Sequence, residues 1–333
     1  MPQGETGIVL HIGGAKCGSS AIQAYLRQNA DALDKRGIAV PGKTLDFTSE
    51  VTGEQIWAFE DAATGGMDGG ALASRLGDLL NNSDQSDHRK IVLSAENLCN
   101  HPSLANTLRR ACGNRASQIV FYVRRQDDFL ISSWQQWHLK LFDTVDAFLA
   151  DRVGRVGCWY SMIAPWADAF GDDRISVRPF TRDRLKDCDV VADFFDVISV
   201  DQDGLSPLVR AANPSFDEAL ARLAHRVNDV FKDQHDNRFY DVMVRLLGKE
   251  ALKQGSASSL LSLETRHRIM ARYEDENEAL KSRFMPEFGD APLFPAPKPT
   301  EVLEVSEAQK MSDDIAMLTR CVYALAKKAE RQT

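Results

Sequence analysis

The sequence predicts an α/β fold: a parallel sheet flanked by helices, with helical additions toward the carboxyl end. The main observation is that short apolar runs alternate with amphipathic helical stretches from residue 7 to about residue 180. Such alternation is typical of a parallel sheet covered on both faces. The second is an ordinary globular composition over 333 residues, with 44% hydrophobic and 26% charged residues. This length allows one large α/β domain with additions.

The strands are predicted from short apolar runs, several of which end in glycine or proline. GIVLHI ends at a pair of glycines, and KIVLS and IVFYV are continuous apolar runs of the kind found in buried parallel strands. The predicted strands cover residues 7–12, 38–40, 90–94, 119–123 and 175–178. Ligands of such sheets bind beyond the carboxyl ends of the strands, so a site is expected there.

The helices are predicted from apolar residues at helical spacing and from their stop signals. The first one carries Ile22, Tyr25, Leu26 and Leu33 on one face and stops before Gly37. The predicted helices cover residues 19–36, 71–80, 103–112, 127–142 and 158–170. Residues 42–70 are rich in Gly, Thr and Asp and are predicted to be mostly loop, as are residues 143–158.

The carboxyl half is organised differently from the amino half. After residue 215 the pattern is helical only, to about residue 284, so residues 1–285 are expected to form one α/β domain with this helical region at 215–285. Five of the twelve prolines fall between Pro286 and Pro299, which predicts a linker over residues 286–300. Residues 301–333 are expected to form a final helix with an apolar face. That face needs a partner surface, either on this chain or on a second copy, as in a homodimer.

Composition excludes several classes of function. A net charge of -8 argues against a general nucleic-acid binder, and no apolar stretch approaches the roughly 20 residues of a membrane span. The start, MPQGETG, lacks the pattern of a signal peptide. Six scattered cysteines without a CxxC pair are expected to be reduced thiols of a cytoplasmic protein. No HExxH motif or His/Cys cluster supports a metal site.

A glycine-rich loop follows the first predicted strand, in LHIGGAKCGSS at residues 10–20. Gly13 and Gly18 have the four-residue gap of a phosphate loop, and a predicted helix starts directly after Gly18. The free N–H groups of that helix point at whatever lies in the loop. The alternative is a plain strand-to-helix turn that needs glycine for its backbone angles. The residues of the predicted anion cradle are Gly13, Gly14, Ala15, Lys16, Cys17, Gly18, Ser19 and Ser20.

The position of the loop lysine separates this loop from that of an NTPase. An NTPase has its lysine directly after the second glycine, where this chain has Ser19, and here Lys16 lies inside the loop. Glu96 ends the strand KIVLSAE as the magnesium-binding acid of an NTPase would, so a small-molecule kinase or NTPase stays open. A sulfuryl group in transfer carries less charge than a phosphoryl group. A lysine and backbone N–H groups can therefore stabilise it without a metal.

The segment HIGGAKCGSSAIQAYL resembles the 5′-phosphosulfate loop of sulfotransferases that use 3′-phosphoadenosine 5′-phosphosulfate (PAPS). In bacterial and carbohydrate members that loop reads HxGxxKTGTTxLQxxL. The matching positions are His11, Gly13, Lys16, Gly18 and Gln23. Cys17, Ser19 and Ser20 stand where the family has threonines; the two serines keep the hydroxyl and Cys17 loses it. The resemblance implies a P-loop NTPase-like fold of the sulfotransferase type. It also implies transfer of a sulfuryl group from PAPS to a hydroxyl or amine, with carbohydrates among the candidate acceptors and no metal.

A second family motif is an arginine that ends a strand, followed by seven residues and a serine on the next helix. IVFYVRRQDDFLISSWQQ supplies it with Arg124 and Ser132. An arginine can bind a phosphate through two parallel hydrogen bonds, and the resemblance implies that this one holds the 3′-phosphate. Arg125 and Ser133 have the same spacing, but Asp128 aligns the first pair with the family pattern. The alternative is that the arginines pair with the aspartates that follow them.

The resemblance also implies a base for the acceptor proton beyond the strand that lies between the two motifs. Glu96 lies there, near the loop, because parallel strands end at the same sheet edge. A carboxylate beside Lys16 and Arg124 is expected to stay ionised, which suits a base, while Lys16 stabilises the leaving group. Alternatively, Glu96 pairs with Lys16 or caps the next helix, and His101 is a second candidate base.

The family pattern is incomplete in the rest of the chain. Many members have a late basic loop over the 3′-phosphate; here Arg210 with Asn213 and Ser215 is a weak substitute. The loops 42–70 and 143–158 and the region after 215 are expected to select the acceptor. The chain is most similar to soluble bacterial members of the family. A catalytically inactive protein that binds a nucleotide or a partner stays open beside the kinase.

Overall fold

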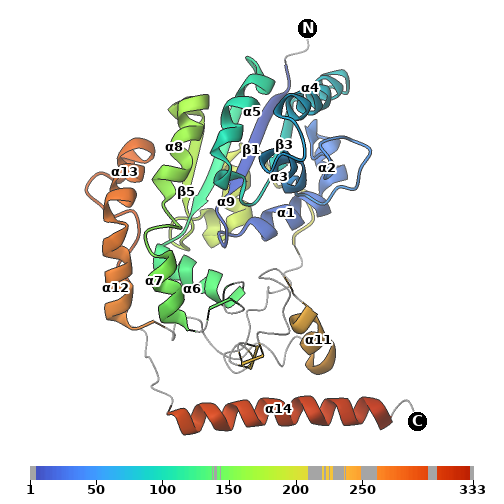
Figure 1. Ribbon diagram of the computed structural model, residues 1–333. Helices are drawn as coiled ribbons and strands as arrows, with labels where there is room; N and C mark the ends of the chain where they lie inside the picture. Colours follow the sequence, from blue (N-terminus) through green and yellow to red (C-terminus); the bar gives the residue numbers. More distant parts are fainter. Residues whose placement is uncertain are drawn as a thin grey trace. The chain divides into compact units, whose positions relative to one another are not determined.

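The computed structural model describes residues 5–136, 138, 141–142, 144–208, 220, 223–224, 226–227, 236, 238–248, 261–298 and 306–330. The chain divides into two compact units. Unit 1 consists of Met1–Arg125, Cys158–Val209 and Glu274–Pro295, and unit 2 of Gln126–Gly157, Arg210–Tyr273 and Ala296–Thr333. Figure 1 shows their elements coloured along the sequence.

Unit 1 is built on a five-stranded sheet in which every pairing is parallel. The strands are β1 (Gly7–Gly13), β2 (Ile38–Ala39), β3 (Lys90–Ser94), β4 (Ser117–Val123) and β5 (Ile175–Pro179). Their order in the sheet is β2-β3-β1-β4-β5. The predicted fold class, a parallel sheet flanked by helices, is confirmed.

The strand order makes β1 the switch point of the sheet. The chain moves from β1 to β2 on one side, returns to β3 beside β1, and then crosses to β4 on the other side. Ligands of open parallel sheets bind at the carboxyl ends of the strands where the order reverses in this way. The segments that follow β1, β3 and β4 are therefore brought to one place, although residues 13, 96 and 124 are far apart in the sequence.

Helices cover both faces of the sheet (Figure 1). The helices of unit 1 are α1 (Ser19–Gln28), α2 (Ala30–Asp34), α3 (Ile56–Ala63), α4 (Gly69–Gln85), α5 (Ala105–Cys112), α8 (Trp159–Phe170), α9 (Val190–Val197) and α13 (Glu274–Phe284). Residues of α1, α2 and α9 share a buried cluster with one face of the strands, to which Val9, Val92 and Val120 belong. On the other face α8 contacts β4 and β5, with α5 beside it.

Unit 2 is helical in its described residues. Its helices are α6 (Gln126–Gln136), α7 (Val145–Arg152), α11 (Arg238–Leu247), α12 (Leu263–Arg272) and α14 (Glu307–Glu330). Arg266 of α12 is buried and forms ion pairs with Asp127, at 2.5 Å, and with Asp128, at 2.9 Å. A buried charge of this kind is tolerated only with its partner, so this contact joins α12 to α6.

Two local predictions were wrong. Residues 143–158 contain the eight-residue helix α7 (Val145–Arg152) and are not one loop, whereas residues 42–70 are mostly loop as predicted, apart from α3 and the start of α4. The predicted helix 19–36 is two helices that meet at Asn29. The Asn29 side chain bonds the backbone of Ser206 through both its oxygen and its nitrogen, at 2.8 and 3.1 Å. This long-range contact holds Asn29 outside the helical geometry and divides the helix.

Candidate functional site

The glycine-rich loop leaves β1 with a backbone that only glycine adopts easily. Gly13, Gly14 and Gly18 have φ of 97°, 101° and 88°, and Lys16 between them has φ of 63°. A Cβ atom on Gly14 would lie 1.9 Å from the carbonyl oxygen of Tyr122 at the end of β4. The loop is therefore seated directly on a neighbouring strand end, and the glycines are needed for close approach as well as for their angles.

The amino end of α1 offers unsatisfied donors to this loop. No side chain caps the helix, and its first turn contains no acidic residue. The Ser19 side chain is buried, and its Oγ has no hydrogen-bond partner among the described residues. An uncapped helix start with an unsatisfied hydroxyl fits an anionic ligand such as a phosphate or phosphosulfate.

Two cations lie beside the loop. Arg124, at the end of β4, donates from Nη1 to the carbonyl oxygen of Lys16 at 3.0 Å, and its guanidinium lies 5.9 Å from the centre of the Phe180 ring. The indole N–H of Trp159 donates to the Arg124 carbonyl at 2.8 Å, which fixes the backbone there. Burial lowers the pKa of Lys16, the Glu96 carboxylate raises it, and Arg124 lowers it again. Two partly desolvated cations side by side favour a ligand of several negative charges.

Glu96 follows β3 and lies against the same loop. Its carboxylate accepts a hydrogen bond from the backbone N–H of Lys16. Burial raises the pKa of Glu96, and the negative charge of Glu54 raises it further, while Lys16 lowers it. Loss of water and the second carboxylate thus outweigh Lys16 in setting the direction of this shift, and the expectation that Glu96 is ionised as a base stays a prediction. A raised pKa brings a carboxylate closer to the range of an effective general base.

Glu54 is the member of the site that the sequence did not reveal. The next residue, Gln55, is buried and forms a double bridge to Ser94 at the end of β3, with N–H···O distances of 2.9 Å in both directions. On the other side, a Cβ on Gly53 would lie 2.1 Å from the backbone oxygen of Gln23 in α1. These two contacts hold Glu54 between α1 and the end of β3, the strand that leads to Glu96.

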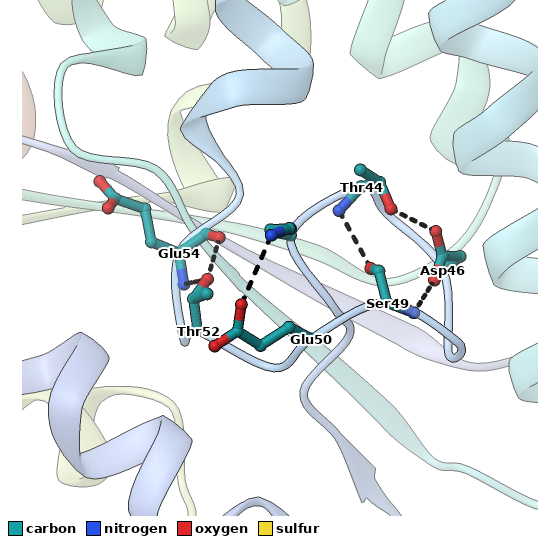
Figure 2. A network of polar contacts seen from close by, with 7 residues as sticks. Thr44, Asp46, Ser49, Glu50, Thr52 and Glu54 are labelled. Atoms are coloured by element: carbon teal, nitrogen blue, oxygen red, sulfur yellow. Dashed lines mark hydrogen bonds and ion pairs between the residues drawn. The ribbon is translucent and has the colours of Figure 1, made fainter.

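The loop that carries Glu54 is organised by its own hydrogen bonds, as Figure 2 shows. Thr44 donates its backbone N–H to Ser49 at 3.3 Å, and Ser49 donates its own to Asp46 at 2.6 Å. Thr52 accepts from the backbone N–H of Glu54 at 3.2 Å and donates to its carbonyl at 2.8 Å. The Glu54 carboxylate points away from the other labelled side chains. The loop thus positions the backbone of Glu54 and leaves its carboxylate to face elsewhere.

Two further residues of the predicted loop motif, Cys17 and His11, have buried side chains. Cys17 is fully buried in the cluster between α1, α9 and the sheet, its thiol donates to the Ala15 carbonyl at 3.4 Å, and burial raises its pKa. The Cys17 side chain therefore packs in the core of unit 1, and its part in binding an anion stays a prediction. His11 is buried in β1 with its Nδ1 2.8 Å from the Ser94 hydroxyl, and burial lowers its pKa to about 3. A neutral His11 therefore joins β1 to β3 behind the loop.

The remaining predicted site residues are placed as follows. Gly13, Gly14, Ala15, Lys16, Gly18, Ser19, Ser20, Glu96 and Arg124 belong to unit 1. Ser132 is half-buried on α6 of unit 2, and Ser133 is buried there. Arg125 donates to the Pro295 carbonyl at 3.3 Å. Arg210, Asn213 and Ser215 lie outside the described residues.

The described part of the chain contains neither a metal-binding cluster nor a membrane-spanning helix. No three His, Cys, Asp or Glu side chains gather there in a way that could bind a metal ion. None of the helices described has the length and apolar character that crossing a bilayer requires.

The known proteins that resemble this chain do so over part of its length. No family model matches the chain. An uncharacterised protein of Archaeoglobus fulgidus is 25% identical over 173 residues, which are 52% of this chain and 47% of that protein. The chain thus spans about half the length of the curated relative it matches. The crystal structure of a sulfotransferase from Alicyclobacillus acidocaldarius is similar over 62% of this chain and 86% of that one, with a TM-score of 0.42 and 17% identity.

Proposed function

We propose that this chain is a sulfotransferase that moves a sulfuryl group from PAPS to a hydroxyl or amine of an acceptor, with carbohydrates as the first class to test. The observation that carries the proposal is the group formed by Lys16, Arg124 and Glu96 around an uncapped helix start at the switch point of the sheet. It combines an anion site with a carboxylate whose pKa is raised.

The residues beside the loop suit the two charged ends of the donor. The N–H groups of the first turn of α1, the Ser19 hydroxyl and Lys16 bind the 5′-phosphosulfate. Arg124 binds the 3′-phosphate. Its contact with the loop, where Arg125 instead donates to Pro295, favours Arg124 in the sequence motif. The partnership of Ser132 with Arg124 stays a prediction from the motif.

The chemistry follows from the position of Glu96. PAPS supplies an activated sulfuryl group. Glu96 takes the proton of the acceptor hydroxyl as the acceptor oxygen bonds to sulfur and the bond from sulfur to the 5′-phosphate oxygen breaks. Lys16 neutralises the charge that develops on the leaving oxygen. The products are a sulfate ester, adenosine 3′,5′-bisphosphate and a protonated Glu96 that returns its proton to water.

Glu54 has a supporting part in this proposal. Its charge raises the pKa of Glu96, so Glu96 holds a proton more firmly than an ordinary glutamate once it has taken one. Glu54 acts through Glu96 and is therefore a positioning residue. A reducing, cytoplasmic setting also belongs to the proposal, and the six free cysteines support it.

The test is a calorimetric titration of the full chain with adenosine 3′,5′-bisphosphate without metal, and in parallel with ADP and Mg²⁺. We expect micromolar binding of the bisphosphate and a loss of at least about tenfold in Lys16→Ala and in Arg124→Ala, the scale of one charge-assisted contact. The matched controls are Lys43→Ala and Arg174→Ala, because both side chains form exposed ion pairs in the same unit.

The outcomes separate the alternatives. Binding of the bisphosphate that both site variants lose, with the controls unchanged, supports the proposal and justifies a screen of acceptors. A preference for ADP with Mg²⁺ overturns it in favour of a kinase or NTPase. Binding of neither ligand overturns it in favour of a protein that acts through a partner.

A further inference from the structure

Helix α14 of unit 2 has two different faces. Asp314, Met317 and Cys321 are buried on one of them, and Asp314 pairs with Arg226 at 3.2 Å. On the same helix, Lys328 donates to the carbonyl of Arg245 in α11 at 3.0 Å, and α11 packs along α14. The inner face of α14 is therefore joined to its own unit.

The outer face of α14 carries an apolar row that is open to solvent. Its side chains are 50–65% exposed. The row consists of Met311, Ile315, Leu318, Val322 and Leu325. Single exposed apolar residues are ordinary on a protein surface, but a contiguous row is typical of an interaction site.

The spacing of this row identifies the kind of partner. The steps between its members are four, three, four and three residues, which is the heptad spacing of a coiled coil. Ala308 and Ala329 continue the same spacing at the two ends of the helix, so the repeat runs for three heptads. Such a row packs best against another helix with the same repeat, and a second copy of α14 has it.

The charges along α14 set the direction of pairing. Apart from Asp314 and Lys328, which contact their own unit, the first half of the helix, residues 307–318, has a net charge of -1, and the second half, residues 319–330, has +1. These charged residues are Glu307, Lys310 and Asp313 in the first half and Arg320, Lys327 and Glu330 in the second. Two parallel copies would place like charges side by side, whereas two antiparallel copies place each acidic half against a basic half.

We propose that α14 pairs with α14 of a second copy of this chain as an antiparallel coiled coil with two-fold symmetry. The register follows from the heptads: Ile315 packs opposite Leu318 of the second copy, and Met311 opposite Val322. A helix of 24 residues is about 36 Å long. The area of one such stripe lies at the small end of specific interfaces, so a dimer in the micromolar range is expected.

The first experiment measures the oligomeric state of the full chain by sedimentation velocity from about 1 to 100 µM, the range a weak interface requires. We expect a concentration-dependent dimer whose dissociation constant rises more than about 100-fold in Leu318→Glu, because a charge would be buried at the centre of the row. Ala316→Glu is the matched control, with the same added charge on an exposed residue of the same helix outside the row. Circular dichroism checks that both variants keep their helices.

A wild-type chain that stays monomeric throughout overturns the proposal, and so does a dimer that Leu318→Glu leaves intact. The direction is tested by mixing Ala308→Cys and Leu325→Cys chains in a Cys188→Ser background, since Cys188 is the exposed native cysteine. Antiparallel pairing gives a disulfide between the two different variants. Disulfides only between identical Ala308→Cys chains would overturn the antiparallel arrangement.

Discussion

Two carboxylates of unit 1 are withdrawn from water in different ways. Asp193 of α9 is fully buried and accepts hydrogen bonds from the Tyr122 hydroxyl at 2.8 Å, from Arg178 at 3.1 and 2.5 Å, and from the backbone N–H of Lys186 at 3.0 Å. Glu96 is half-buried, accepts from the Lys16 backbone and faces the charge of Glu54. The first carboxylate is surrounded by donors, and the second is beside another negative charge.

The surroundings of Asp193 suit a carboxylate that stabilises the fold, whereas those of Glu96 suit a general base. A buried carboxylate whose oxygens accept several hydrogen bonds joins the groups that donate to it. A charge that burial and a like charge oppose gains a proton more easily, which is what a general base must do. Substitution of Glu96 should therefore lower turnover, whereas substitution of Asp193 should lower stability.

The largest effect is expected for Glu96→Gln. Because the amide cannot accept the acceptor proton, turnover should fall by about 10² to 10⁴, the usual range for a general base. Binding of adenosine 3′,5′-bisphosphate should stay within a few-fold of wild type. The measurement is steady-state sulfation of an acceptor found in the screen, with calorimetry for the nucleotide. Turnover close to that of wild type would show that Glu96 is not the base.

Asp193→Asn should act on stability instead. It removes the negative charge that Arg178 and Tyr122 surround, and loss of one member of such a pair costs about 3 kcal/mol in the free energy of unfolding. Nucleotide binding measured well below the unfolding transition should be retained. Urea unfolding followed by tryptophan fluorescence checks the loss, with the exposed Asp183→Asn as control. An unchanged midpoint would remove the distinction drawn between the two carboxylates.

The smallest effect is expected for Glu54→Gln, and it is a shift along the pH axis. The charge of Glu54 raises the pKa of Glu96, so a neutral amide lowers that pKa. Glu96 then stays ionised to lower pH, and the acid limb of kcat/KM moves to lower pH. The pH profile measures this, with Glu50→Gln as control because Glu50 pairs with Lys43 in the same loop. A profile that stays in place, or moves to higher pH, would contradict the role of Glu54.

The sequence predicted most of the sheet because buried parallel strands are continuous apolar runs, and all five were found within two residues of their ends. It missed α9 (VVADFFDV), whose eight residues are too few for a helical period to stand out. It also missed the break at Asn29, because that break depends on a contact with Ser206 that is 177 residues away.

The site, like the fold, could be predicted from the sequence only in part. Lys16, Glu96 and Arg124 each follow a predicted strand, so the topology of a parallel sheet was enough to expect them at one edge. Glu54 follows no strand. It comes close to Glu96 because Gln55 bonds the end of β3 and Gly53 packs against α1, and neither contact leaves a periodic pattern. The one available signal was a Gly-Glu-Gln step just before an apolar helix.

The backbone at Lys16 has a consequence for how this protein tolerates change. Its φ of 63° is a left-handed conformation that costs a residue with a side chain about 1 kcal/mol, and glycine much less. Lys16→Gly should therefore raise the melting temperature while it removes the loop charge. The lysine at this position therefore lowers the thermal stability of the chain. A library at position 16 sorted by heat resistance and the same library sorted by nucleotide capture should enrich different amino acids.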